Sequence, residues 1–293
     1  MIYLGQTIKS SFHGFSELIR VSEEISSCND EKCEMNFSKV DWFDANMCAP
    51  FGAILYKFYV KGWPITVYGQ RPEIASILQR NRFLPNFGFD IPIKPDYYGT
   101  TIEYKRFERT DSASFIEYIT EQFAGKKIPK MTEALKKRFR ASISELFENA
   151  VAHSQTTLGI FACGQYYPKG NRLDFSVADR GMGIRRAVNR FTGQRMNAVE
   201  AIEWATTGDN TTRERKGGKP GGLGLKLIKE FIDLNKGRVH IVSDSGYWCY
   251  EEGQTKTRRF KMPFPGTVVN IEINTADTSS YRLASELNPD SIF

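Results

Sequence analysis

Three short motifs, in a set order between residues 145 and 225, constrain this 293-residue chain more than any other feature. The first is Glu145-Leu-Phe-Glu-Asn149-Ala, in a segment with the period of an amphipathic helix. The second is Asp179-Arg-Gly181-Met-Gly183, directly after an apolar run typical of a strand. The third, Gly221-Gly222-Leu223-Gly224-Leu225, opens a further helical pattern. We interpret the three motifs as parts of one site.

The first motif belongs to a helix predicted over residues 132–153, with Thr132 as its N-cap. Apolar residues three or four apart give it a buried stripe: Leu135, Phe139, Ile143, Leu146 and Ala150. Glu145 and Asn149 are four apart and therefore project from one face. Asparagine can offer Mg²⁺ a neutral oxygen, and glutamate can deprotonate an attacking water. An ordinary solvated helix face is the alternative interpretation.

The second motif ends a predicted hairpin of strands 157–163 and 173–178, joined by a turn at 167–171. A buried carboxylate at Asp179 could accept a hydrogen bond from an exocyclic amine, which adenine offers. Gly181 and Gly183 allow a sharp turn and a close approach of the backbone to a planar base. A plain turn is the alternative.

The third motif predicts a phosphate site, because bare N–H groups at Gly221, Gly222 and Gly224 would open a helix that ends at Gly237. Leu223 and Leu225 are among its apolar positions. The preceding segment, 184–220, turns basic and glycine-rich, which suits a mobile lid over phosphates. Its candidates for the γ-phosphate are Arg213, Lys216 and Lys219.

Together the motifs resemble the ATP-binding domain shared by gyrase, Hsp90, histidine kinases and MutL, the GHKL superfamily. The resemblance covers residues 101–275 and implies a Bergerat-type α/β sandwich with a mixed, largely antiparallel sheet. It implies ATP and Mg²⁺ as ligands, with Asn149 on the metal, Glu145 as the base and Asp179 on the adenine amino group. Thr267, in Pro265-Gly-Thr-Val-Val269, would assist Asp179 through water.

Residues 1–95 alternate strand and helix patterns and predict a separate α/β domain. A strand over 34–40, a helix over 46–60, a strand over 64–68 and a helix over 71–80 are similar to a STAS domain, the fold of anti-sigma-factor antagonists. That family places a phosphoacceptor Ser or Thr after the aspartate that corresponds to Asp44, whereas this chain has Ala45. A generic α/β module is the alternative. Residues 90–100 form the predicted linker, and 276–293 a polar, loosely packed tail.

The bulk composition describes a globular protein with a mild basic excess. Its net charge is +6 and its hydrophobic content 41%. No run approaches the roughly 20 apolar residues of a membrane span, and no signal peptide is evident. Five scattered cysteines indicate reduced thiols, so we expect a cytoplasmic location. No nucleic-acid motif and no dimerisation element stand out, although many relatives dimerise.

Three functions remain open at this point. The first is a switch that closes a lid over Mg-ATP and hydrolyses it slowly. The second is a protein kinase of the histidine-kinase or anti-sigma-factor type acting on a separate protein. The third is a non-catalytic nucleotide sensor. A protein partner would bind through the STAS-like domain or the lid.

Overall fold

The structure is a computed structural model that describes residues 1–27, 31–207, 223–283 and 286. Its described helices are α1 (Phe12–Ser27), α2 (Cys48–Tyr59), α3 (Pro72–Arg80), α4 (Ser112–Phe123), α5 (Glu133–His153), α6 (Gly183–Thr192), α7 (Ala198–Thr206) and α8 (Leu223–Asn235), with 3-10 turns η1 (Ala45–Met47), η2 (Pro85–Phe87) and η3 (Pro168–Gly170). Its described strands are β1 (Ile2–Tyr3), β2 (Thr7–Ile8), β3 (Cys33–Asn36), β4 (Trp42–Phe43), β5 (Ile65–Tyr68), β6 (Thr101–Phe107), β7 (Lys130–Met131), β8 (Ile160–Tyr167), β9 (Arg172–Asp179), β10 (Arg238–Glu251), β11 (Gln254–Asn274) and β12 (Ser280–Tyr281). This content confirms the predicted mixed α/β class.

The centre of the molecule is a five-stranded antiparallel sheet in the order β10-β11-β9-β8-β6. β8 and β9 are the predicted hairpin, and η3 forms its turn. The largely antiparallel sheet is therefore confirmed. Its register places Thr267 of β11 opposite Asp179, the last residue of β9.

β10 folds back on itself, which the sequence interpretation missed. Arg238 and Glu251, at its two ends, form an ion pair of 3.1 Å. A straight strand of this length would separate them by about 40 Å. The chain reverses at Asp244, whose φ is +53°. The returning half carries Tyr250, whose hydroxyl donates to Asp233 of α8 at 2.5 Å.

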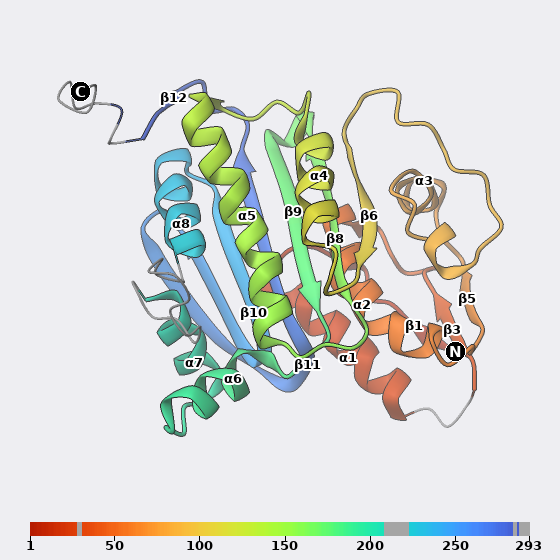
Figure 1. Cartoon of the computed structure of the whole chain (residues 1–293). Helices are drawn as coiled ribbons and strands as arrows, with labels where there is room; N and C mark the ends of the chain where they lie inside the picture. Colours follow the sequence, from red (N-terminus) through yellow and green to blue (C-terminus); the bar gives the residue numbers. More distant parts are fainter. Residues whose placement is uncertain (28–30, 208–222, 284–285, 287–293) are drawn as a thin grey trace.

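One face of the sheet is covered by α4, α5 and α8 (Figure 1). α5 is the predicted helix 132–153, and the Thr132 hydroxyl caps it by accepting from the Leu135 N–H at 3.3 Å. Its apolar stripe packs into one core with the sheet; Phe147, for example, stacks on Phe115 of α4 with ring centroids 4.6 Å apart. Burial of this stripe explains why the helix forms here.

The N-terminal segment covers the opposite face of the same sheet, with α1 against β11 and α2 against β8 and β9. The two share one hydrophobic core. Residues up to Phe87 pack there with sheet residues Phe161, Cys163, Ala178, Val242, Tyr247, Cys249, Phe260, Phe264 and Val268. Within the N-terminal segment, β1, β3 and β5 form a parallel sheet, and the predicted strand 34–40 is reduced to β3.

Buried polar contacts join the N-terminal segment to the sheet. The Asn46 amide nitrogen lies 3.0 Å from Ser176 Oγ of β9 and 2.8 Å from Asn270 Oδ1 of β11. Arg172 of β9 pairs with the fully buried Asp44 at 2.7 Å. The Ala45 N–H donates to the Tyr167 hydroxyl at 2.9 Å. The loop from Asp44 to Asn46 is therefore enclosed between the two parts.

Three local predictions need correction. The first part of the predicted lid segment is ordered as α6 and α7. After α8 it is Lys236, not Gly237, that has positive φ, at +55°. Gly237 instead meets β11, because a Cβ there would lie 2.2 Å from the Glu272 carbonyl oxygen. The tail does not pack only loosely, since β12 pairs with β7.

Candidate functional site

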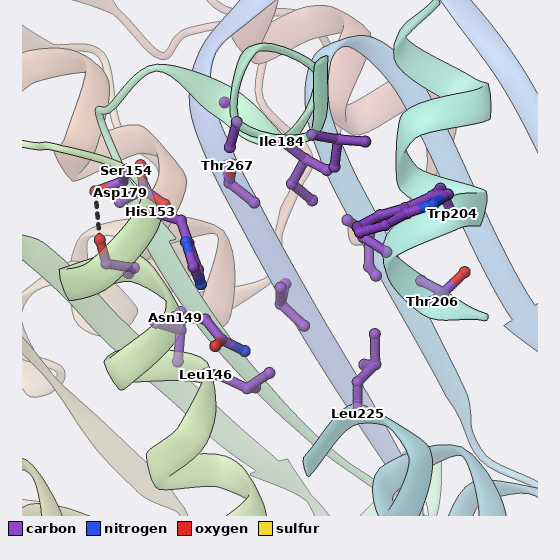
Figure 2. A pocket seen from close by; sticks show the side chains of 18 residues that line it. Leu146, Asn149, His153, Ser154, Asp179, Ile184, Trp204, Thr206, Leu225 and Thr267 are labelled. Carbon is purple, nitrogen blue, oxygen red and sulfur yellow. Dashed lines mark hydrogen bonds between the residues drawn. The ribbon is translucent and has the colours of Figure 1, made fainter. Parts of the chain in front are cut away.

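A cavity of about 150 Å³ opens between α5, the ends of β9 and β11, α6, α7 and the start of α8. Figure 2 shows Leu146 and Asn149 on one side, facing Trp204 and Thr206 across the cavity. The walls are mainly apolar; besides the residues labelled in the figure they include Val177, Ala187, Val188, Ile241 and Val269. Such a cavity suits a flat, largely apolar ring with a few fixed polar contacts.

Asp179 and Thr267 supply polar groups at the end of the sheet. They are direct cross-strand neighbours, so their side chains share the face that lines the cavity. The Gly181 N–H donates to Asp179 Oδ1 at 2.8 Å. Thr267 Oγ1 lies 3.0 Å from Ser243 Oγ, which in turn accepts from the Ile184 N–H at 2.8 Å. The carboxylate and hydroxyl are therefore held in place before any ligand arrives.

Burial controls the charge of Asp179, whose side chain is almost fully enclosed. This burial raises the pKa of the Asp179 carboxyl from 3.8 to about 7, although hydrogen bonds from the Gly181 N–H and the Ser154 hydroxyl lower it. A buried carboxyl that titrates near neutrality, in a cavity, is typical of a functional group.

The two glycines near Asp179 are required by close packing. A Cβ on Gly181 would lie 2.1 Å from the Ser154 carbonyl oxygen at the end of α5. A Cβ on Gly266 of β11 would lie 2.0 Å from the Asp179 carbonyl oxygen. Gly183 begins α6 with φ +77°. The glycines thus let the Asp179 loop pack against both α5 and β11.

We expect Gly181→Ala to destabilise the fold by about 3 kcal/mol, because the added methyl must displace backbone. Gly170→Ala is the matched control, since the nearest heavy atom to its Cβ is 3.5 Å away. Urea unfolding of both variants measures the difference. Equal stability of the two would contradict the packing described for the Asp179 loop.

The two polar residues of the first motif occupy different places. Asn149 lines the cavity and points into it (Figure 2). Glu145 lies one turn earlier on α5, half-buried, and is not among the lining residues. No group of three or more His, Cys, Asp or Glu side chains gathers as a metal cluster within the described residues. A lone amide oxygen fits Mg²⁺ that arrives with phosphates, since this ion keeps most of its ligands as water and phosphate oxygens.

Gly221 and Gly222 of the third motif lie outside the described residues, as do the preceding cations Arg213, Lys216 and Lys219. Leu223 and Gly224 are the first residues of α8, and Leu225 lines the cavity. The predicted helix start therefore meets the same cavity as Asn149 and Asp179.

Several lining residues escaped the sequence interpretation. Trp204 and Thr206 come from α7, and Ile184 from α6. A signal for α7 was present, because Asn197 and Glu200 form a capping box. His153, at the end of α5, also lines the cavity. The segment 184–220 ends in glycines and basic residues, and this composition led us to predict a mobile lid for the whole of it.

Comparison with known proteins agrees with this geometry. Residues 134–271 match the family of histidine kinase-, DNA gyrase B- and HSP90-like ATPases. This segment is therefore similar to that family in sequence, and the match covers just under half of the chain. The chain is also 29% identical over 110 residues to the circadian input-output histidine kinase CikA of Synechococcus elongatus. That match covers 38% of this chain and only 13% of the relative. None of the described helices is long and apolar enough to cross a membrane.

Proposed function

We propose that this protein binds Mg-ATP in the cavity beside Asp179 and hydrolyses it slowly as a conformational switch. The observation that carries the proposal is the buried Asp179 carboxylate, fixed by Gly181 and paired with Thr267 in an apolar cavity. It can accept from the exocyclic amine of adenine, while the apolar walls hold the ring. Guanine presents a carbonyl at that position and would be rejected.

The phosphates would extend from the base toward Asn149 and the start of α8. Asn149 would give its amide oxygen to Mg²⁺, and the first N–H groups of α8 would face the phosphates. The predicted cations Arg213, Lys216 and Lys219 precede α8 in sequence and would close over the γ-phosphate. Glu145, one turn before Asn149, would deprotonate the attacking water.

The N-terminal segment would act as a fixed rear layer of the switch rather than as a detachable STAS-like partner. Ala45, at the position where a STAS domain would carry its phosphoacceptor, is fully buried and has no hydroxyl. A partner would therefore read the nucleotide state elsewhere, for example at α6 and α7, which border the cavity.

A kinase is the second candidate, favoured by the similarity to a histidine kinase. Of the three described histidines, His153 lines the cavity one turn beyond Asn149, where we expect it to pack rather than to accept phosphate, and the other two do not support autophosphorylation within one chain. His13 lies on α1, behind the sheet from the cavity. His240 is buried, and its pKa is lowered to about 3 by burial. A kinase activity would therefore act on a separate protein.

The fate of a labelled γ-phosphate distinguishes a hydrolysing switch from a kinase and from a nucleotide sensor. With Mg-ATP, we expect free phosphate to form slowly, and Glu145→Gln to lower its rate about 100-fold while nucleotide still binds. Asn149→Ala should weaken Mg²⁺-dependent binding itself. Label retained on an added protein would establish a kinase instead. Binding without either product would establish a sensor.

The pKa of Asp179 predicts a pH dependence of ATP affinity. Only the ionised carboxylate accepts well from the amine, so affinity should fall about fivefold between pH 7 and pH 6 and level off above about pH 8. Because the pKa of Asp179 is higher in the folded than in the unfolded chain, its protonated form stabilises the ligand-free fold. This contribution is complete below about pH 3.8 and is lost as the pH rises through about 7. Calorimetric titration across this range measures the affinity. Asp179→Asn, which has no carboxyl to titrate, should show only the change due to the phosphates of ATP.

A further inference from the structure

Residues 125–140 form a strongly basic segment of this chain. This segment contains one acid, Glu133, and seven cations: Lys126, Lys127, Lys130, Lys136, Lys137, Arg138 and Arg140. Seven minus one is +6, which equals the net charge of the whole chain, 40 minus 34. The charges of the remaining residues cancel in total, although residues 180–199 carry five arginines and no acid. A strongly basic segment creates a local field that attracts anions to that place.

The structure gathers this charge around a groove at the N-terminal end of α5. The groove has a volume of about 580 Å³ and is lined by Lys126, Lys130, Lys136 and Arg140. No carboxylate is among its lining residues. Of the seven cations, only Lys136 forms an ion pair within the described part of the chain, with Glu133 at 2.7 Å. Lys127, Lys137 and Arg138 are exposed around it.

This groove is separate from the ATP cavity. Lys136 lies in the first turn of α5, whereas Asn149 lies near its last turn. The rise of an α-helix places them about 20 Å apart along its axis. Figure 1 shows the N-terminal end of α5, beside β12, at the opposite end of the molecule from α6.

Exposed aromatic side chains lie near the same end. Tyr97 and Tyr98 are 87% and 84% exposed, the highest values among the large hydrophobic residues described. They follow Asp96, which lines a second hollow of mixed charge that also contains Lys94, Lys126, Glu103 and Glu121. Lys126 lines both hollows, so the tyrosine loop adjoins the basic groove. The Thr101 N–H donates to Asp96 at 2.6 Å and fixes the base of the loop.

We propose that this end of the molecule binds single-stranded nucleic acid, with phosphates in the groove and bases stacked on Tyr97 and Tyr98. Cations along a groove can bind successive phosphates of a nucleic-acid backbone, and exposed rings offer stacking surfaces to bases of any sequence. A flat bilayer fits a concave groove poorly. An acidic peptide would use the cations but leaves the two tyrosines without a stacking role.

Fluorescence anisotropy of the full chain with a labelled oligothymidylate of about 20 nucleotides tests the proposal. We expect salt-dependent binding. Lys130→Glu with Arg140→Glu should weaken it about 100-fold and lower the slope of log K against log salt by about 1.4. Tyr97→Ala with Tyr98→Ala should weaken it at least about tenfold through lost stacking. Thermal unfolding midpoints confirm that each variant is folded.

The matched control is Arg259→Glu with Lys261→Glu, which removes the same charge from exposed positions on β11. It should bind like the original chain. If the control lost as much affinity for the oligonucleotide, the effect would come from net charge alone, and the proposal would be overturned. It would also fail if no oligonucleotide binds, if the tyrosine variant binds normally, or if polyglutamate binds more tightly than the oligonucleotide.

Discussion

Asp179→Asn is expected to weaken Mg-ATP binding about 100-fold, roughly 2.7 kcal/mol, without unfolding the protein. The Gly181 N–H needs an acceptor at the position of Oδ1, so an asparagine must keep its oxygen there. Its NH₂ group then faces the ligand and meets the adenine amine as donor against donor. The same NH₂ could donate to the carbonyl of guanine, so the ratio of GTP to ATP affinity should rise.

Calorimetric titration with ATP and GTP measures both effects. Asp41→Asn, at an exposed carboxylate of the N-terminal segment, is the control and should leave both affinities unchanged. If Asp179→Asn bound ATP with unaltered affinity, the Asp179 carboxylate would not contact the base, even if the fold is as described.

Removal of residues 1–95 is expected to prevent residues 96–293 from folding. The cut would uncover the rear face of the sheet, where Phe161, Phe260, Phe264, Val242 and Val268 are buried. Uncovering five such side chains costs on the order of 10 kcal/mol. That is comparable to the whole stability of a typical domain, about 5–15 kcal/mol.

Urea unfolding and near-ultraviolet circular dichroism of the fragment test this expectation. The full chain should unfold in one transition, because the N-terminal segment and the sheet share a core. A fragment that folds and binds Mg-ATP would instead show that the first 95 residues form an independent domain.

Local pattern predicted the parts of the site that depend on local structure. The period of apolar residues in 132–153 identified α5, and turn chemistry between two apolar runs identified β8 and β9. Asp179 was recognisable because a carboxylate before two glycines ends a strand. The register that sets Thr267 opposite Asp179 follows from sheet pairing and was reached only through family resemblance.

Contacts between segments far apart in the chain could not be predicted from the sequence pattern. Asn46 was predicted to begin a helix, yet its amide bonds to Ser176 and Asn270, more than 100 residues away. The reversal of β10 lies at Ser243-Asp244-Ser245-Gly246, where the sequence offers turn residues that were not used in the prediction. The basic segment 125–140 was hidden because the net charge of +6 looked evenly spread.

Equilibrium binding of Mg-ATP to the full chain at about pH 8, where the Asp179 carboxylate is ionised, tests the central claim most directly. The account predicts saturable binding at one site, competed by adenine nucleotides and not by GTP. Absence of saturable binding, or equal competition by GTP, would contradict an adenine site at Asp179.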